Sequence, residues 1–112
     1  MIYLASPYSH PDPGVRTTRY RQAAWHAVRL MQDGRLVYSP IVHSHPLSVL
    51  GLPGDWPFWA DHNRAMLAAC QTLVVLTLPG WEHSKGIAAE LALAAELEIP
   101  VEYEDPREVS GG

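Results

Sequence analysis

Cysteine is almost missing from this chain of 112 residues. Cys70 is the only one, so a disulfide within the chain is impossible and a cysteine-rich metal site is excluded. Cys70 follows Ala68 and Ala69 at the end of an expected helix, a position typical of a buried structural thiol.

Positive charge is also scarce. The chain has 8 Lys and Arg against 12 Asp and Glu, which gives a formal net charge of -4. No segment concentrates basic residues as a polyanion-binding surface would require. We therefore expect no nucleic-acid polymer as a partner.

Long apolar runs are missing as well. No stretch approaches the ~18 apolar residues of a membrane span, and the chain starts directly on the apolar run 2–5, without the basic region of a cleavable signal. We expect a cytoplasmic protein with no membrane contact. The length suits one domain with its own core, so residues 1–112 are predicted to form one domain with a polar tail from about residue 104.

Apolar segments and turn-forming segments alternate regularly along the chain. Strands are expected at 2–5, 36–38, 73–78 and 100–103, and helices at about 15–33, 55–69 and 84–98. The first helix is predicted to be amphipathic because Ala24, Ala27, Val28 and Met31 recur at helical spacing, and Gly34 stands where a terminating glycine belongs. Residues 40–54 are predicted to be a loop of about fifteen residues, a length that indicates function or mobility.

This order of elements predicts a parallel sheet with right-handed crossovers and helices on both faces. Ligands of such sheets bind beyond the carboxyl ends of the strands. The loops expected there are Ser6–Gly14, Pro40–Gly54 and Pro79–Ser84, and together they hold most of the Pro, Gly, Trp and His residues. We expect the functional site at this edge.

Glu90 is the sharpest local signal. At ~100° per residue it lies on the same helical arc as Ile87, Ala94 and Leu97, so its carboxylate is predicted to face the sheet. An unpaired buried charge costs several kcal/mol or shifts its pKa, so this position calls for a partner or a chemical role. The alternative is that Glu90 bends toward solvent or toward a Lys or Arg.

Ser84 and Gly86 begin the same helix. Free backbone N–H groups and the positive end of the helix dipole attract anions there, and Gly86 lets an anion approach the backbone. Plain helix capping also explains Ser84 without any ligand.

Asp61 is expected one turn after Phe58 and one turn before Ala65, on the inward arc of the preceding helix. Two inward acids on neighbouring helices could divide nucleophilic and proton-transfer roles. A first-turn Asp that interacts with the helix dipole is the other explanation.

Histidines and aromatic residues gather at the same edge. They are His43, His45, His62 and His83, with Tyr8, Trp56, Trp59 and Trp81. No triad has the spacing of a recognised metal motif, and we expect neither a metal nor another cofactor. The aromatic rings could stack on a planar base, or shield the core or a dimer contact.

Three stretches resemble the nucleoside 2-deoxyribosyltransferase superfamily. They are Ile2-Tyr3-Leu4-Ala5-Ser6, Asp61 ahead of Leu67-Ala68-Ala69-Cys70-Gln71, and Ser84-Lys85-Gly86-Ile87-Ala88-Ala89-Glu90. The resemblance spans residues 1 to about 103. The spacing from Ser84 through Gly86 to Glu90 is also similar to that of the deoxynucleoside 5′-monophosphate N-glycosidases, whose serine binds the phosphate. That similarity favours a nucleotide over a nucleoside.

The resemblance implies a three-layer flavodoxin-like (Rossmann-like) parallel sheet of four to five strands. It implies that Glu90 is the nucleophile on the sugar C1′, that Asp61 assists proton transfer to the base and that Tyr3 orients the nucleophile. The expected substrate contacts are Ser6, Ser9, Arg19, Ser84, Gly86 and Trp81. A carboxylate can trap the oxocarbenium-like centre that forms when an N-glycosidic bond breaks, as in retaining glycosidases.

Two functions of different classes follow. The first is a nucleotide or nucleoside N-glycosidase or deoxyribosyltransferase, and the alternative is a non-catalytic module that binds or senses a nucleotide. In both, the partner is a small nucleotide or nucleoside. Relatives complete their sites across an interface, so we expect a homodimer or homotetramer.

Overall fold

Four parallel strands form the middle layer of the structure. The computed structural model describes residues 1–106, and its strands are β1 (Ile2–Ala5), β2 (Val37–Tyr38), β3 (Thr72–Leu76) and β4 (Val101–Glu104). They pair in the order β2-β1-β3-β4, and every pairing in this sheet is parallel. In this register Tyr3 pairs with Tyr38 on one side and with Leu73 on the other.

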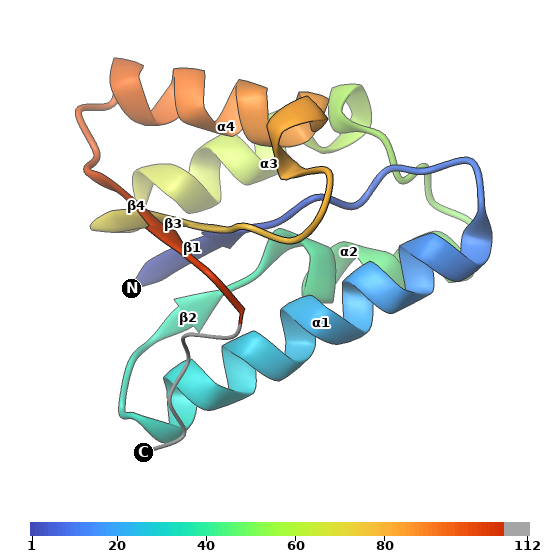
Figure 1. The fold of residues 1–112 in the computed structure, drawn as a ribbon. Coiled ribbons are helices and arrows are strands. Elements are labelled where there is room, and N and C mark those ends of the chain that lie inside the picture. Colours follow the sequence, from blue (N-terminus) through green and yellow to red (C-terminus); the bar gives the residue numbers. More distant parts are fainter. Residues whose placement is uncertain (107–112) are drawn as a thin grey trace.

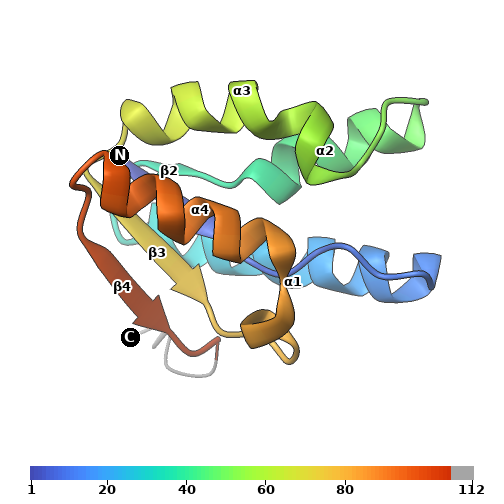
Figure 2. The same cartoon turned by 90° about the horizontal axis from the view of Figure 1, so that it is seen from above.

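Helices cover both faces of this sheet (Figure 1). They are α1 (Pro13–Gln32), α2 (Pro40–Val49), α3 (Trp56–Ala68) and α4 (Lys85–Glu96), with a short 3-10 helix η1 (Trp81–His83) ahead of α4. α1 packs on one face, and Figure 2 shows α3 and α4 side by side on the other. The prediction of an α/β fold with a parallel sheet between helices is confirmed, and the arrangement is compatible with a three-layer flavodoxin-like fold.

Alternate residues of the strands build two separate cores, because successive side chains of a strand point to opposite faces. The core under α3 and α4 contains Tyr3, Ala5, Leu73 and Val75 with Leu67, Ile87 and Ala94. The core under α1 contains Ile2, Leu4, Val74 and Leu76 with Leu30. Cys70 is buried in the first core, as expected, and its thiol donates a hydrogen bond to the Met66 carbonyl.

The buried side of α1 differs from the apolar stripe in its sequence. Ala23, His26 and Leu30 are buried, whereas Val28 and Met31 are exposed. His26 occupies a core position because its Nε2 lies 2.7 Å from Oε1 of Glu104, at the end of β4. That partner is 78 residues away in the chain, so the apolar spacing of α1 could not indicate it.

The prediction of a loop over 40–54 is wrong for its first ten residues, which form α2. The Ser39 hydroxyl accepts a hydrogen bond from the Val42 amide, and Pro40 fits the first helical position, where no amide hydrogen is needed. Pro46 lies inside the helix and obscured it, because proline normally interrupts a helix.

Among the described helices, none combines the length and apolar character needed to cross a membrane.

The chain leaves β1 toward β2 on one side of the sheet, whereas β3 lies on the other side of β1. The loops after β1 and β3 therefore diverge at this point, which is where parallel sheets form their ligand crevice. The loop after β3 leads to α4, whose first residues Lys85 and Gly86 line a cavity at this edge. The predicted polar tail lies outside the described residues from 107 onward.

Candidate functional site

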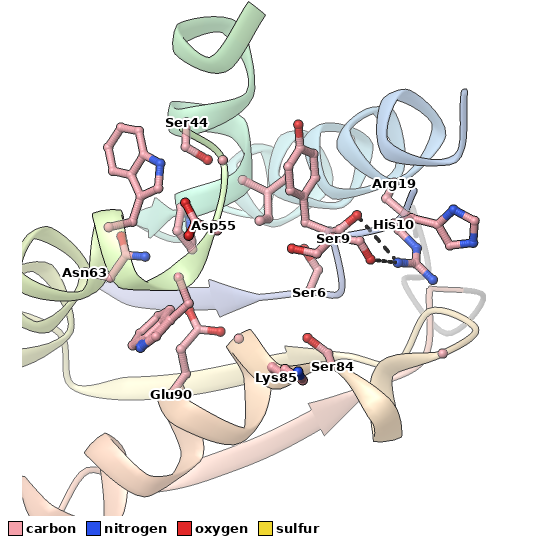
Figure 3. Close-up of a pocket in the computed structure, with 18 of the residues that line it drawn as sticks. Ser6, Ser9, His10, Arg19, Ser44, Asp55, Asn63, Ser84, Lys85 and Glu90 are labelled. Atoms are coloured by element: carbon pink, nitrogen blue, oxygen red, sulfur yellow. Dashed lines mark hydrogen bonds between the residues drawn. The ribbon is translucent and has the colours of Figure 1, made fainter. Parts of the chain in front are cut away.

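A cavity of about 840 Å³ opens at the carboxyl ends of the strands. Its walls come from the loop after β1, from α2, from the start of α3, and from the segment that leads into α4 (Figure 3). The topology predicted this edge. Of the expected site residues, the cavity brings together Glu90, Ser6, Ser9, Arg19, Ser84 and Gly86.

Glu90 faces this cavity from α4 and is only 4% exposed. Its inward orientation is confirmed, since Ile87 and Ala94 are buried on the same side of the helix. Burial raises the pKa of the Glu90 carboxyl to about 8, and the neighbouring Tyr3 hydroxyl opposes this shift only in part. At neutral pH the carboxyl in this structure is therefore mostly protonated, and its ionised form would be poorly solvated.

Tyr3 lies beneath Glu90 in the core and does not line the cavity. Its hydroxyl is close enough to Glu90 to influence the pKa of the carboxyl, but it makes no hydrogen bond of normal geometry with any described residue. Burial raises the pKa of Tyr3 far above its usual range, and Glu90 adds to that shift. Tyr3 is therefore a neutral hydrogen-bond donor within reach of Glu90, a position compatible with the expected orienting role.

Tyr38 extends this polar neighbourhood away from the cavity. Its ring centroid lies 5.7 Å from that of Tyr3, and burial, then Glu90, raises its pKa to about 12. Its hydroxyl lies 3.1 Å from Nε2 of His62 on α3. Glu90 thus has two tyrosines nearby that stay neutral at physiological pH.

The N-terminus of α4 forms one end of the cavity. Ser84 caps the helix as expected, because its Oγ accepts a hydrogen bond from the Ile87 amide at 3.1 Å. The Ser84 hydroxyl hydrogen remains available to a ligand. A Cβ added at Gly86 would meet nothing closer than Ser84 Oγ at 3.8 Å, so packing alone does not demand this glycine. Lys85 also lines this end.

Arg19 links the loop after β1 to the loop after β3. Its Nη1 donates to the Ser9 carbonyl at 3.0 Å and its Nη2 to the Pro79 carbonyl at 3.4 Å. Gly80 makes this possible, since it has a φ of 92° and a Cβ there would lie 2.9 Å from Nη2 of Arg19. Carbonyl partners do not neutralise the guanidinium, so Arg19 and Lys85 make this end of the cavity positive.

Two buried polar side chains line the cavity without a partner. Ser6 at the end of β1 is 4% exposed, and Asn63 on α3 is 7% exposed. Neither the Ser6 hydroxyl oxygen nor Asn63 Oδ1 finds a hydrogen-bond partner among the described residues. Ser6 was predicted, whereas Asn63 was missed, although it stands one turn after Trp59.

Asp61 does not face the cavity, and the expectation that it points inward is wrong. α3 buries Trp59, Asn63 and Leu67, which places Asp61 on the exposed side. Trp59 defines the inward arc because its Nε1 donates to the Pro53 carbonyl at 2.7 Å, whereas Phe58 is 49% exposed.

Asp55, the residue before α3, lines the cavity instead and makes no capping hydrogen bond with its side chain. Among the described residues that line the cavity, Asp55 and Glu90 are the two that have carboxyl groups. The site therefore holds a pair of acids, but the second acid comes from the loop ahead of α3 rather than from the helix itself.

Trp81 was expected to contact substrate, but it does not line the cavity. Its ring lies 5.5 Å from that of Tyr103 and packs against the core under α4. The aromatic side chains that do line the cavity are Tyr8, Trp56 and Trp59.

The histidines are dispersed around the site. His83 lines the cavity, His45 Nδ1 lies 2.6 Å from the Tyr8 hydroxyl, and the parallel rings of His43 and His62 lie 5.1 Å apart. His43 and His62 are not among the lining residues. Within the described part of the chain, no group of three or more His, Cys, Asp or Glu side chains could hold a metal ion.

Comparison with known proteins places the chain in a family. No curated protein matches it. Residues 1–105 match the family model described as a domain of unknown function, DUF1937. Since this match includes every strand and helix described above and all the residues that line the cavity, the chain belongs to the DUF1937 family.

Proposed function

We propose that this protein is a nucleotide or nucleoside N-glycosidase or deoxyribosyltransferase that cleaves the base–sugar bond with Glu90 as the nucleophile. The observation that supports this most directly is a buried carboxyl that shares one cavity with the N-terminus of α4. Glu90 follows Ser84 by six residues, which is ~9 Å along a helix axis. A pentose with its 5′-phosphate can span that separation.

The proposed reaction proceeds in two steps. The Glu90 carboxylate bonds to C1′ while the C1′–N bond breaks, and the bonding electrons leave with the base, which takes up a proton. Water, or a second base, then bonds to C1′ and gives its proton to the acid that protonated the first base, while the C1′–O bond to Glu90 breaks, which releases the sugar product and restores the carboxylate. Asp55 is our candidate for the proton donor in place of Asp61, because Asp55 lines the cavity.

The surroundings of Glu90 favour the neutral carboxyl but leave the ionised form, which is the nucleophile, reactive. Burial keeps the pKa of the carboxyl near 8, and a poorly solvated carboxylate is reactive once formed. Positive charge that develops at C1′ would stabilise the ionised form. Tyr3 can donate a hydrogen bond to it without adding a competing charge.

A non-catalytic module that binds or senses nucleotides is the second candidate. It is favoured by the same raised pKa, because a protonated Glu90 can donate a hydrogen bond to a ligand but cannot attack C1′. In that case the cavity would bind the same class of molecule without turnover.

Base release from purified protein tests the two candidates. The substrates are the 2′-deoxynucleoside 5′-monophosphates and the matching nucleosides, with chromatographic detection of the free base. We expect release from a monophosphate and none from the Glu90→Gln variant. Glu96→Gln is the matched control, since Glu96 is an exposed glutamate on the same helix, paired with Arg64. Nucleotides that raise the melting temperature without base release would favour the sensing module.

A homodimer or homotetramer in the cytoplasm remains part of the proposal. It rests on the resemblance to proteins that complete their sites across an interface. The exposed apolar side chains of Trp25, Val28 and Met31 on α1 are one surface that a second copy could cover. Light scattering on a size-exclusion column measures the mass directly, and a monomer at assay concentration would contradict this part.

A further inference from the structure

We infer that Asn63 is the residue that reads the base, by pairing its amide with the donor and acceptor edge of a planar nitrogen heterocycle. This inference rests on the proposed function, because it names the part of the cavity that would distinguish one nucleotide from another. It starts from an amide that is 7% exposed, lines the cavity, and has an Oδ1 without a partner among the described residues.

A buried amide oxygen without a partner is unusual, because nearly all buried polar groups in native proteins are hydrogen-bonded. Leaving one unpaired costs stability, and an apolar side chain of similar size would avoid that cost. Figure 3 shows Asn63 on the wall formed by α3, with Glu90 reaching the same space from α4. A ligand in this cavity could supply the partner that the folded chain does not.

One neighbouring side chain on α3, Trp59, suits a flat, neutral ligand. Trp59 precedes Asn63 by one helical turn and lines the same cavity. Its indole N–H is already bonded to the Pro53 carbonyl, so it has an aromatic surface to offer rather than a hydrogen bond. Aromatic surfaces beside amides recognise nucleobases, since the ring stacks on the base and the amide pairs with its edge.

Charge divides the cavity into two ends. Arg19, Lys85 and the N-terminus of α4 make one end positive, which suits a phosphate. Asn63 and Trp59 lie on α3 and contribute no charge, and Figure 3 shows Asn63 on the opposite side of the cavity from Arg19. A nucleotide has the same division, with an anionic phosphate and a neutral base on opposite sides of the sugar.

An amide also differs from an acid in what it can do. It donates and accepts hydrogen bonds but releases no proton at physiological pH. Asn63 would therefore determine which base is held and how it is oriented, while proton transfer is left to Asp55. Its loss should weaken binding of the base and leave binding of the sugar phosphate unchanged.

Calorimetric titration of the full chain tests this separation. The probes are the four common 2′-deoxynucleoside 5′-monophosphates and 2-deoxyribose 5-phosphate, which has the same sugar and phosphate without a base. All titrations use the Glu90→Gln background, so that no ligand is consumed. We expect at least one nucleotide to bind at least about tenfold more tightly than the sugar phosphate.

Asn63→Leu should remove most of that advantage, about tenfold or more, and change the affinity for 2-deoxyribose 5-phosphate less than about threefold. Asn63→Ala makes the same comparison if the leucine variant does not fold. Gln22→Leu is the control, because it removes an exposed amide on α1, outside the cavity. Asn63→Asp should change the ranking of the four bases, since it keeps an acceptor and loses both donors.

Three outcomes would overturn the inference. They are unchanged affinities in Asn63→Leu, an equal loss for nucleotides and sugar phosphate, and no nucleotide that binds more tightly than the sugar phosphate. The proposed function fails separately, by the absence of base release from the protein with Glu90 intact. If the protein binds bases through Asn63 but does not cleave nucleotides, the inference about Asn63 stands and the proposed enzymatic activity is refuted.

Discussion

α3 and α4 lie side by side on the same face of the sheet, yet they bring different chemistry to the cavity. α4 contributes a buried carboxyl and a helix N-terminus, whereas α3 contributes an amide and an indole. Both helices have an acid near their middle, but Glu90 is buried and Asp61 is exposed. Under the proposed function, α4 would supply the reactive group and α3 would supply recognition.

The two acids make the strongest test of this division. Glu90→Gln should lower base release by about 10⁴-fold or more, because it removes the proposed nucleophile. Asp61→Asn should stay within about threefold of the unmodified protein, since a remote exposed side chain has little effect on the reacting atoms. Turnover with the preferred monophosphate measures both. A large loss in Asp61→Asn would show that α3 also takes part in the chemistry.

The pH dependence of the free energy of unfolding, compared with and without the Glu90 carboxyl, measures the titration of this one acid. Its pKa is raised from 4.5 to about 8 in the folded protein, so the folded state holds a proton that the unfolded state has released between these values. The contribution of Glu90 to stability is fully present below pH 4.5, and several kcal/mol of it is lost as the pH rises to about 8. Glu90→Gln should remove this decline.

Chemical denaturation at pH 5, 7 and 9 measures this effect. Relative to the unmodified protein, Glu90→Gln should gain stability as the pH rises. Glu96→Gln, on the exposed side of α4, should not reproduce that gain. Parallel pH profiles for the unmodified protein and Glu90→Gln would mean that the carboxyl titrates normally.

Asp55 tests whether the second acid comes from the start of α3. Asp55→Asn should slow base release by about 10²-fold, within the range for a lost general acid. It should also flatten the alkaline side of the pH–rate profile, because a proton donor must be protonated to act. Because Asp55 makes no capping hydrogen bond with its side chain, the melting temperature should change little. Normal activity in Asp55→Asn would mean that the leaving base takes its proton from solvent rather than from Asp55.

Ser84 gives the smallest expected effect and tests the positive end of the cavity. Ser84→Ala should cost about 1 kcal/mol of stability through loss of the helix cap. If the hydroxyl also contacts phosphate, the preference for monophosphates over nucleosides should fall by about tenfold. Ser84→Asp separates the two roles, because it keeps a capping oxygen and repels the phosphate. If both variants keep the preference for monophosphates over nucleosides, Ser84 acts only as a helix cap.

The sequence predicted the fold well where local patterns decide it. Apolar runs marked the strands, and Gly34, Asp55 and Ser84 marked helix ends within a few residues. α2 was missed because Pro46 suggested a break that the helix tolerates. The exposed side of α1 was unexpected because a distant partner, Glu104, holds His26 in the core.

The site was predicted from α4 more accurately than from α3. Glu90 has apolar neighbours at helical spacing on one side only, so its orientation was readable. On α3, Phe58 and Trp59 are adjacent, and either could have faced the core. Tertiary contact through Trp59 rotates the inward arc by ~100° relative to an arc centred on Phe58. That rotation exposes Asp61 and brings in Asn63, an uncharged residue that no local pattern distinguishes.

Arg19 has a further consequence for how the cavity responds to a ligand. Its guanidinium donates hydrogen bonds to the carbonyl groups of Ser9, in the loop after β1, and Pro79, in the loop after β3. The two loops are thereby restrained together when the chain folds, and less conformational entropy is left to lose on binding. Any substitution that frees Arg19, such as Gly80→Ala, would separate the loops and make the mouth of the cavity looser at both sides at once.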